Sequence, residues 1–124
     1  MRACYVILHH TGVDDPHFDV MIESAPDGPL MTWRSGRWPI DAPTPLTRLP
    51  DHRRDYLTYE GPLSNDRGRV ARVAAGTCAV TATSRFQQIV HFTDGGPFRP
   101  LSIVETTPPR CLAVPVSDSL SGAP

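Results

Sequence analysis

The stretch His17–Ser24 reads H-F-D-V-M-I-E-S, and it decides how this chain is expected to fold. Its residues alternate between an apolar set and a mainly polar set, namely Phe18, Val20 and Ile22 against His17, Asp19, Met21 and Glu23. Successive side chains of a strand point to opposite faces, so this period of two predicts a half-buried β-strand. We expect its apolar set to lie in the core together with Val6, which belongs to the preceding strand.

Similar short stretches recur along the chain, and most of them are bounded by glycine, proline, aspartate or asparagine. Strands are expected at Cys4–His9, Leu30–Trp33, Asp55–Glu60, Arg69–Ala75, Thr77–Thr83, Phe86–Phe92, Leu101–Glu105 and Cys111–Val116. Ser35–Pro50 and Thr93–Pro97 are expected to be loops, and Gly76 is expected to turn a hairpin. Because no window shows sustained helical spacing, the chain is predicted to be all-β: a compact, closed or nearly closed barrel of about seven or eight short antiparallel strands with long loops and little helix.

The composition suits one folded domain. The chain has 124 residues with 40% hydrophobic content, and its 14 prolines and 9 glycines indicate many turns. We expect a single domain over residues 1–116 and a flexible polar tail over residues 117–124. With no long apolar run and no signal-peptide pattern, the protein is expected to be cytoplasmic and without a membrane partner. Cys4, Cys78 and Cys111 are expected to be buried free thiols, because an odd number at wide spacing is a poor disulfide framework.

The net charge of -1 excludes a general affinity for polyanions, but the basic residues are distinctive. Lysine is absent, and the chain is rich in arginine between Arg48 and Arg72. The planar guanidinium binds phosphate in a bidentate way, which an ammonium group does not. This segment is therefore a candidate phosphate-binding region.

The motif His17-x-Asp19 is the strongest local signal of chemistry. Residues two apart on a strand project from the same face, and His10 ends the preceding strand across a short loop. If the two strands pair, His10, His17 and Asp19 form a three-ligand face of a kind that suits Mn²⁺, Fe²⁺ or Zn²⁺. The alternative is an ordinary surface pair with no metal.

A second candidate cluster is His52 and Tyr56 in the stretch D-H-R-R-D-Y-L-T-Y-E-G. Both side chains can face a groove, where they would transfer a proton or donate a hydrogen bond to an oxyanion. The alternative is a tyrosine in the core and a histidine in solvent.

These blocks together resemble the 3′-phosphoesterase domain of bacterial DNA ligase D. That family has a strand ending in histidine, then H-Y-D-x-R-L-E, then a small residue with tryptophan, and later E-D-H-P-x-x-Y-x-x-F-E-G. The present chain has Y-V-I-L-H-H, H-F-D-V-M-I-E, L-M-T-W and P-D-H-R-R-D-Y-L-T-Y-E-G in the same order. The resemblance covers roughly Arg2 to Gly76; beyond it only the strand pattern is similar.

The resemblance implies a metal held by His10, His17 and Asp19, with Mn²⁺ expected and Zn²⁺ or Fe²⁺ as alternatives. His9 stays open as an alternative to His10. The active-site histidine and tyrosine of the family fall on His52 and Tyr56, and Glu60 is expected to orient a histidine.

Two phosphate-binding arginines of the family are missing, because their positions hold Met21 and Thr44. We expect Met21 to line the pocket, and we expect Arg48, Arg53 or Arg54 to have taken over the phosphate contact.

The function implied is metal-dependent phosphoester hydrolysis at nucleic-acid 3′ ends, as in DNA end processing and repair. The partners would be DNA or RNA–DNA 3′ ends, and separate ligase, polymerase or end-binding repair proteins. The alternative is a non-catalytic or altered-substrate binding module that kept the metal site and lost the arginines.

Overall fold

The computed structural model describes residues 1–93 and 99–116, and these residues are nearly all β. Part of the expected loop after Phe92 and the expected tail at 117–124 lie outside the described residues. The elements are β1 (Arg2–Thr11), β2 (His17–Glu23), β3 (Leu30–Ser35), β4 (Thr44–His52), the short 3₁₀ helix η1 (Arg54–Leu57), β5 (Gly61–Pro62), β6 (Arg69–Ser84), β7 (Gln87–Phe92), β8 (Leu101–Glu105) and β9 (Arg110–Pro115). No helix in the described ranges is long and apolar enough to cross a membrane.

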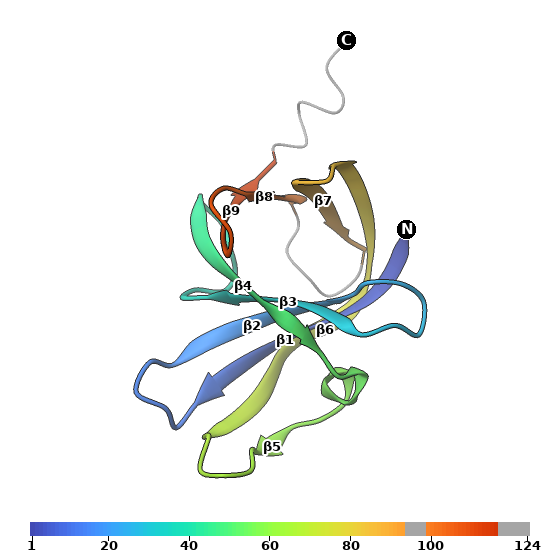
Figure 1. Ribbon diagram of the computed structural model, residues 1–124. Coiled ribbons are helices and arrows are strands. Elements are labelled where there is room, and N and C mark those ends of the chain that lie inside the picture. The colour runs from blue at the N-terminus through green and yellow to red at the C-terminus, as the bar shows by residue number, and fades with distance from the viewer. Residues whose placement is uncertain (94–98, 117–124) are drawn as a thin grey trace.

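Eight of the strands close into an antiparallel barrel (Figure 1). The order around the sheet is β1-β2-β3-β4-β9-β8-β7-β6, and a further pairing of β6 with β1 completes the ring. The two-residue strand β5 pairs with the start of β6, whose other edge is paired there with β1. The predicted small, closed all-β barrel with little helix is therefore confirmed.

One strand was not predicted, because β4 occupies the second half of the segment expected to be a loop. Thr44 and Leu46 are buried while Pro45 and Thr47 are exposed, so the period of two is present. The many prolines between Pro39 and Pro50 obscured it, since proline is usually a turn residue.

The strand predicted at Asp55–Glu60 is wrong, because this segment starts with η1. The amides of Tyr56 and Thr58 donate to the carbonyls of Arg53 and Asp55, which is local turn geometry. Tyr56 and Leu57 are neighbours in sequence and pack against the same hydrophobic cluster. A strand would direct these two side chains to opposite faces, whereas a tight turn lets both of them pack on the same cluster.

The hairpin predicted around Gly76 is also wrong, because β6 runs unbroken through it. Gly76 lies opposite Tyr5 in the β1–β6 pairing, and the register shifts nearby at Ile7/Leu8. A glycine inside a strand commonly marks such an irregularity or a close approach, not a chain reversal. The long β6 thus pairs with β1 over its first part and with β7 over its second part.

The barrel strands carry two hydrophobic clusters, one on each face of the β1–β2–β3 sheet. The first lies inside the barrel and includes Val20, Ile22 and Trp33, with Phe18 only partly buried against it. The second, on the outer face, contains Val6, Leu8, Met21, Leu30 and Val70, and it is covered by Tyr56, Leu57 and Leu63. Strand β2 is therefore buried on both faces and not half-buried, and Val6 is buried in the outer cluster.

The three cysteines are free thiols, as predicted. Cys78 and Cys111 are buried, as expected. Cys4 is exposed, so the expectation that it is buried was wrong.

An ion pair fastens η1 to the end of β2. Arg54 donates to the carboxylate of the buried Glu23 and to the carbonyl of Gly28, and the amide of Cys4 donates to Glu23 at 2.6 Å. Burial alone would raise the pKa of Glu23, but the hydrogen bonds from Cys4 and Arg54 outweigh it and lower the pKa below its ordinary value.

We therefore expect Arg54→Gln to lower the melting temperature at neutral pH. A carboxylate with a lowered pKa stabilises the fold above its unfolded-state pKa, and this contribution disappears as pH falls through the folded-state pKa. The melting temperatures of variant and wild type should converge below the ordinary Glu23 value of 4.5. Thermal unfolding followed by circular dichroism from pH 3 to 7 measures this, with Arg37→Gln as the exposed control. If the difference in melting temperature between Arg54→Gln and wild type is the same at every pH, the ion pair with Glu23 is not the cause of the destabilisation.

Candidate metal centre

The pairing of β1 with β2 brings the three predicted metal ligands together. His10 lies directly opposite His17 in this antiparallel pair, and Asp19 lies two residues along β2 on the same face. His17 and Asp19 are each 5% exposed, so the site is formed against a packed sheet and not in a mobile loop.

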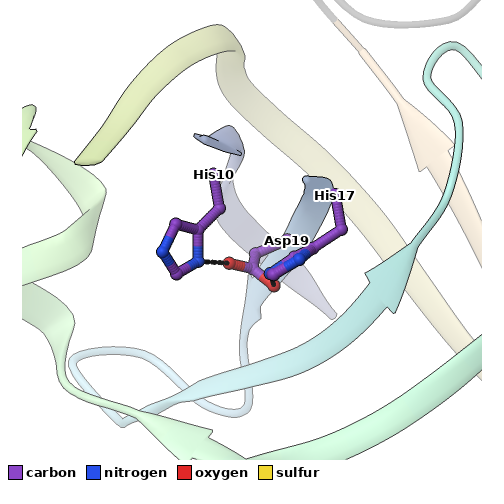
Figure 2. A group of neighbouring side chains, drawn as sticks. All are labelled: His10, His17 and Asp19. Carbon is purple, nitrogen blue, oxygen red and sulfur yellow. Dashed lines mark ion pairs between the residues drawn. The ribbon is translucent and has the colours of Figure 1, made fainter. Parts of the chain in front are cut away.

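The side-chain atoms converge on one point (Figure 2). His10 Nδ1 lies 3.8 Å from Asp19 Oδ2, and His17 Nε2 lies 3.5 Å from Asp19 Oδ1. One ligand atom from each residue can be chosen so that all lie within 4.8 Å of one another. The spacing is that of groups around a shared centre and is too long for direct hydrogen bonds.

Backbone carbonyls fix both imidazole rings from behind. His10 Nε2 donates to the carbonyl of Arg67 at 2.6 Å, and His17 Nδ1 donates to the carbonyl of Asp15 at 2.8 Å. A carbonyl only accepts, so these nitrogens carry the protons and the opposite nitrogen of each neutral ring presents a lone pair. This outer hydrogen bond is the usual support of a metal-binding histidine.

The inner atoms of the cluster lack partners. His17 Nε2 and Asp19 Oδ1 are buried without a hydrogen bond. Two imidazole lone pairs and a carboxylate facing one another repel, whereas a cation between them satisfies all three. The residues present therefore fit a divalent metal, and two histidines with one carboxylate are a donor set for Mn²⁺, Fe²⁺ or Zn²⁺.

The turn before β6 supports the ring of His10 by bringing the Arg67 carbonyl close to β1. Gly68 has a φ of +81°, and a Cβ at this position would lie 2.1 Å from the carbonyl oxygen of Thr11. Only glycine fits this conformation and this approach.

A cleft of about 630 Å³ opens over the cluster. His52 and Tyr56 line it, so the structure brings both predicted catalytic residues into one cleft with the predicted metal ligands. His52 Nδ1 donates to the carbonyl of Pro50 at 2.9 Å, and its ring centroid lies 5.7 Å from that of Tyr56. Met21 also lines the cleft, as expected, although it is only 1% exposed and belongs to the outer hydrophobic cluster.

His9, the alternative ligand, is not part of this cluster. It stacks on Phe18 with ring centroids 4.4 Å apart, on the face opposite to His10. The phase of β1 thus favours His10.

The arginines expected to replace the phosphate contact do not line this cleft. Arg48 pairs with Asp51 at 2.8 Å and lies over the ring of Trp33, which belongs to the barrel interior. Arg54 is bound to Glu23. Arg53 lines two smaller clefts, both of which also include Tyr56.

Two further residues that the resemblance singled out have partners away from the cluster. Thr44 is buried and lies outside the cleft, where its hydroxyl donates to the carbonyl of Ala42. Glu60 was expected to orient a histidine, but it accepts hydrogen bonds from Arg72 instead and has no hydrogen bond or ion pair with a histidine in the described residues.

Sequence reasoning missed Arg34 and Arg67, which both line the cleft. Arg34 lies opposite Asp19 in the β2–β3 pairing, a position that follows once the register of that hairpin is known. Arg67 contributes its backbone carbonyl to the cluster, and the type of side chain at a position does not reveal such a backbone contact.

No protein-family model matches the chain, and no curated protein matches it significantly.

Proposed function

We propose that the protein is a metal-dependent phosphoesterase that acts on nucleic-acid 3′ ends. The observation that supports this most is the convergence of His10, His17 and Asp19 beside His52 and Tyr56 in one cleft. The order and spacing that resemble the phosphoesterase domain of DNA ligase D add to it. Its substrates would be DNA or RNA–DNA 3′ ends in the cytoplasm, with a separate ligase or polymerase acting afterwards.

The ligands His10, His17 and Asp19 would hold the metal, with Mn²⁺ favoured. When bound, such an ion supplies Lewis-acid polarisation of a phosphoryl oxygen and lowers the pKa of a coordinated water. The three side chains come from two adjacent strands and are fixed by backbone carbonyls, so little reorganisation is needed to bind the ion.

His52 is suited to move a proton at the reacting phosphoester. Its Nδ1–H is held by the Pro50 carbonyl, so Nε2 is the nitrogen that gains or loses the proton. The hydroxyl of Tyr56 has no hydrogen-bond partner within residues 1–93 and 99–116, and it can donate to a phosphoryl oxygen.

The direct test is a cleavage assay with added Mn²⁺ on two substrates. One is a primer–template ending in a 3′-phosphate, and the other is a primer ending in a 3′-ribonucleotide. We expect release of phosphate from the first and trimming of the second, both abolished by a chelator. No product from either substrate, with the protein folded and loaded with Mn²⁺, would reject the proposal.

The second candidate is a non-catalytic or altered-substrate binding module. The residues Met21 and Thr44 favour it, because they replace two arginines that hold phosphate in the family. Under this alternative the protein binds a 3′ end or another ligand at the metal and releases it unchanged.

A further inference from the structure

We propose that Arg34 is the phosphate-binding residue of this cleft and takes the place of the arginine missing at Met21. This inference rests on the proposed function and deepens it, since it names the group that recognises the substrate. The guanidinium would contact non-bridging oxygens of the phosphoryl group at the metal, by two parallel hydrogen bonds.

The register of the sheet places Arg34 beside the metal ligands. In the β2–β3 pairing Arg34 lies directly opposite Asp19, and Thr32 lies opposite Met21. Directly opposed residues of an antiparallel pair share a face and stand about 5 Å apart at Cβ. The family has its arginine at the position of Met21 on β2. In this chain the positive charge would instead lie on the neighbouring strand β3, on the same face of the sheet as the predicted metal ligands.

Of the two arginines that line this cleft, Arg34 is the one whose side chain is free to bind a ligand. It is exposed, and in the described part of the chain its side chain has no hydrogen bond or ion pair. By contrast Arg48 and Arg54 are held by carboxylates, and Arg67 donates twice to Ser64. A guanidinium with no internal partner loses no existing contact when phosphate binds.

The charge of the cleft makes such a cation necessary for an anionic substrate. Four carboxylates line the cleft, those of Asp14, Asp15, Asp19 and Asp66, against the two guanidinium groups of Arg34 and Arg67. A divalent ion at the ligands offsets part of this negative charge, and Arg34 supplies the positive charge on the β3 side.

The position of Arg34 indicates a strand end as the substrate and not a small phosphoester. Arg34, His17 and Asp15 line both the main cleft and a second cleft of about 480 Å³. The second cleft contains Arg110, which is exposed and has no side-chain partner within the described ranges. A chain whose terminal phosphate lies at Arg34 can continue toward Arg110, where the next phosphate would bind.

The matched control for Arg34 is Arg69. Both are exposed strand arginines without a side-chain partner in the part of the chain that the structure describes. Arg69 is outside the clefts, because its neighbour Val70 occupies the cleft face of β6. Substitution of either residue by glutamine therefore removes the same charge from different faces.

The experiment compares wild type, Arg34→Gln, Arg34→Lys and Arg69→Gln, each loaded with Mn²⁺. Binding of a 3′-phosphorylated oligonucleotide and of the same oligonucleotide with a 3′-hydroxyl is measured by fluorescence anisotropy, and turnover is measured on the first. We expect Arg34→Gln to weaken binding of the 3′-phosphate form and to lower kcat/KM, each at least tenfold, with Mn²⁺ affinity unchanged. Arg34→Lys should recover part of the loss, and Arg69→Gln should match wild type.

A third variant tests the substrate class. Arg110→Gln should raise KM by a larger factor for the oligonucleotide than for a nucleoside 3′-monophosphate. If wild type binds the 3′-phosphate form through Arg34 but shows no turnover, the proposed reaction fails while the role of Arg34 stands. If Arg34→Gln stays within twofold of Arg69→Gln, or if it loses Mn²⁺ affinity, Arg34 is not the phosphate-binding residue and the inference is overturned.

Discussion

Asp19→Asn is expected to lower the affinity for Mn²⁺ by at least about a hundredfold. Asp19 is the anionic member of the cluster, and both of its oxygens face an imidazole nitrogen. Loss of even a residue behind a metal ligand typically costs 10–100-fold in affinity, so loss of the charged ligand should cost more. Calorimetric titration of the metal-free protein with Mn²⁺ measures the effect.

The same variant should not destabilise the metal-free fold. Asp19 Oδ1 and His17 Nε2 are buried without partners, and this arrangement is unfavourable when no cation is present. An asparagine amide can donate to His17 Nε2 while it removes the buried charge. We therefore expect the melting temperature of metal-free Asp19→Asn to equal or exceed that of wild type.

Asp66→Asn is the matched control, since Asp66 lines the same cleft but is exposed and lies outside the cluster. Its positive φ of 54° is also tolerated by asparagine. It should bind Mn²⁺ like wild type. If Asp19→Asn binds Mn²⁺ normally, or if it melts far below wild type without metal, the cluster is a structural ion pair and not a metal site.

His52→Ala should lower turnover on a 3′-phosphate end by about 10²–10⁴-fold, which is the usual contribution of a general acid or base. The affinity for Mn²⁺ should be unchanged, because His52 is not one of the converging ligands. Single-turnover measurements with saturating Mn²⁺ separate this chemical step from substrate binding.

Tyr56→Phe provides the comparison for His52→Ala. It removes only the hydroxyl and keeps the ring that packs on the outer hydrophobic cluster. We expect a smaller loss than in His52→Ala, because one neutral hydrogen bond is lost and no proton transfer. Wild-type turnover in His52→Ala would show that His52 only lines the cleft.

The barrel and the ligand cluster were predictable because both depend on the period of a strand. The alternation in His17–Ser24 determined the face of His17 and Asp19, and the phase of the first strand favoured His10 over His9. These predictions need only one pairing, that of β1 with β2. A cluster built from adjacent strands is therefore accessible to reasoning from sequence.

The proposed phosphate-binding role of Arg34 was not predictable in the same way, because it depends on which arginines are already held by other side chains. Arg48 and Arg54 are close to His52 in sequence, but carboxylates on other segments hold them. Arg34 is distant in sequence from His52 and reaches the cleft through the register of the β2–β3 hairpin. The strand predicted at Asp55–Glu60 was wrong for a related reason. The segment begins with η1, which covers the outer hydrophobic cluster, and the alternating pattern did not indicate that this cluster exists.

We propose above that His10, His17 and Asp19 hold one divalent metal ion. A crystal structure of the protein grown with Mn²⁺ tests it directly, using anomalous scattering at the manganese absorption edge. We predict one peak that is coordinated by His10 Nδ1, His17 Nε2 and a carboxylate oxygen of Asp19. A cluster without a peak at saturating Mn²⁺, or a peak held by other residues, would contradict the account.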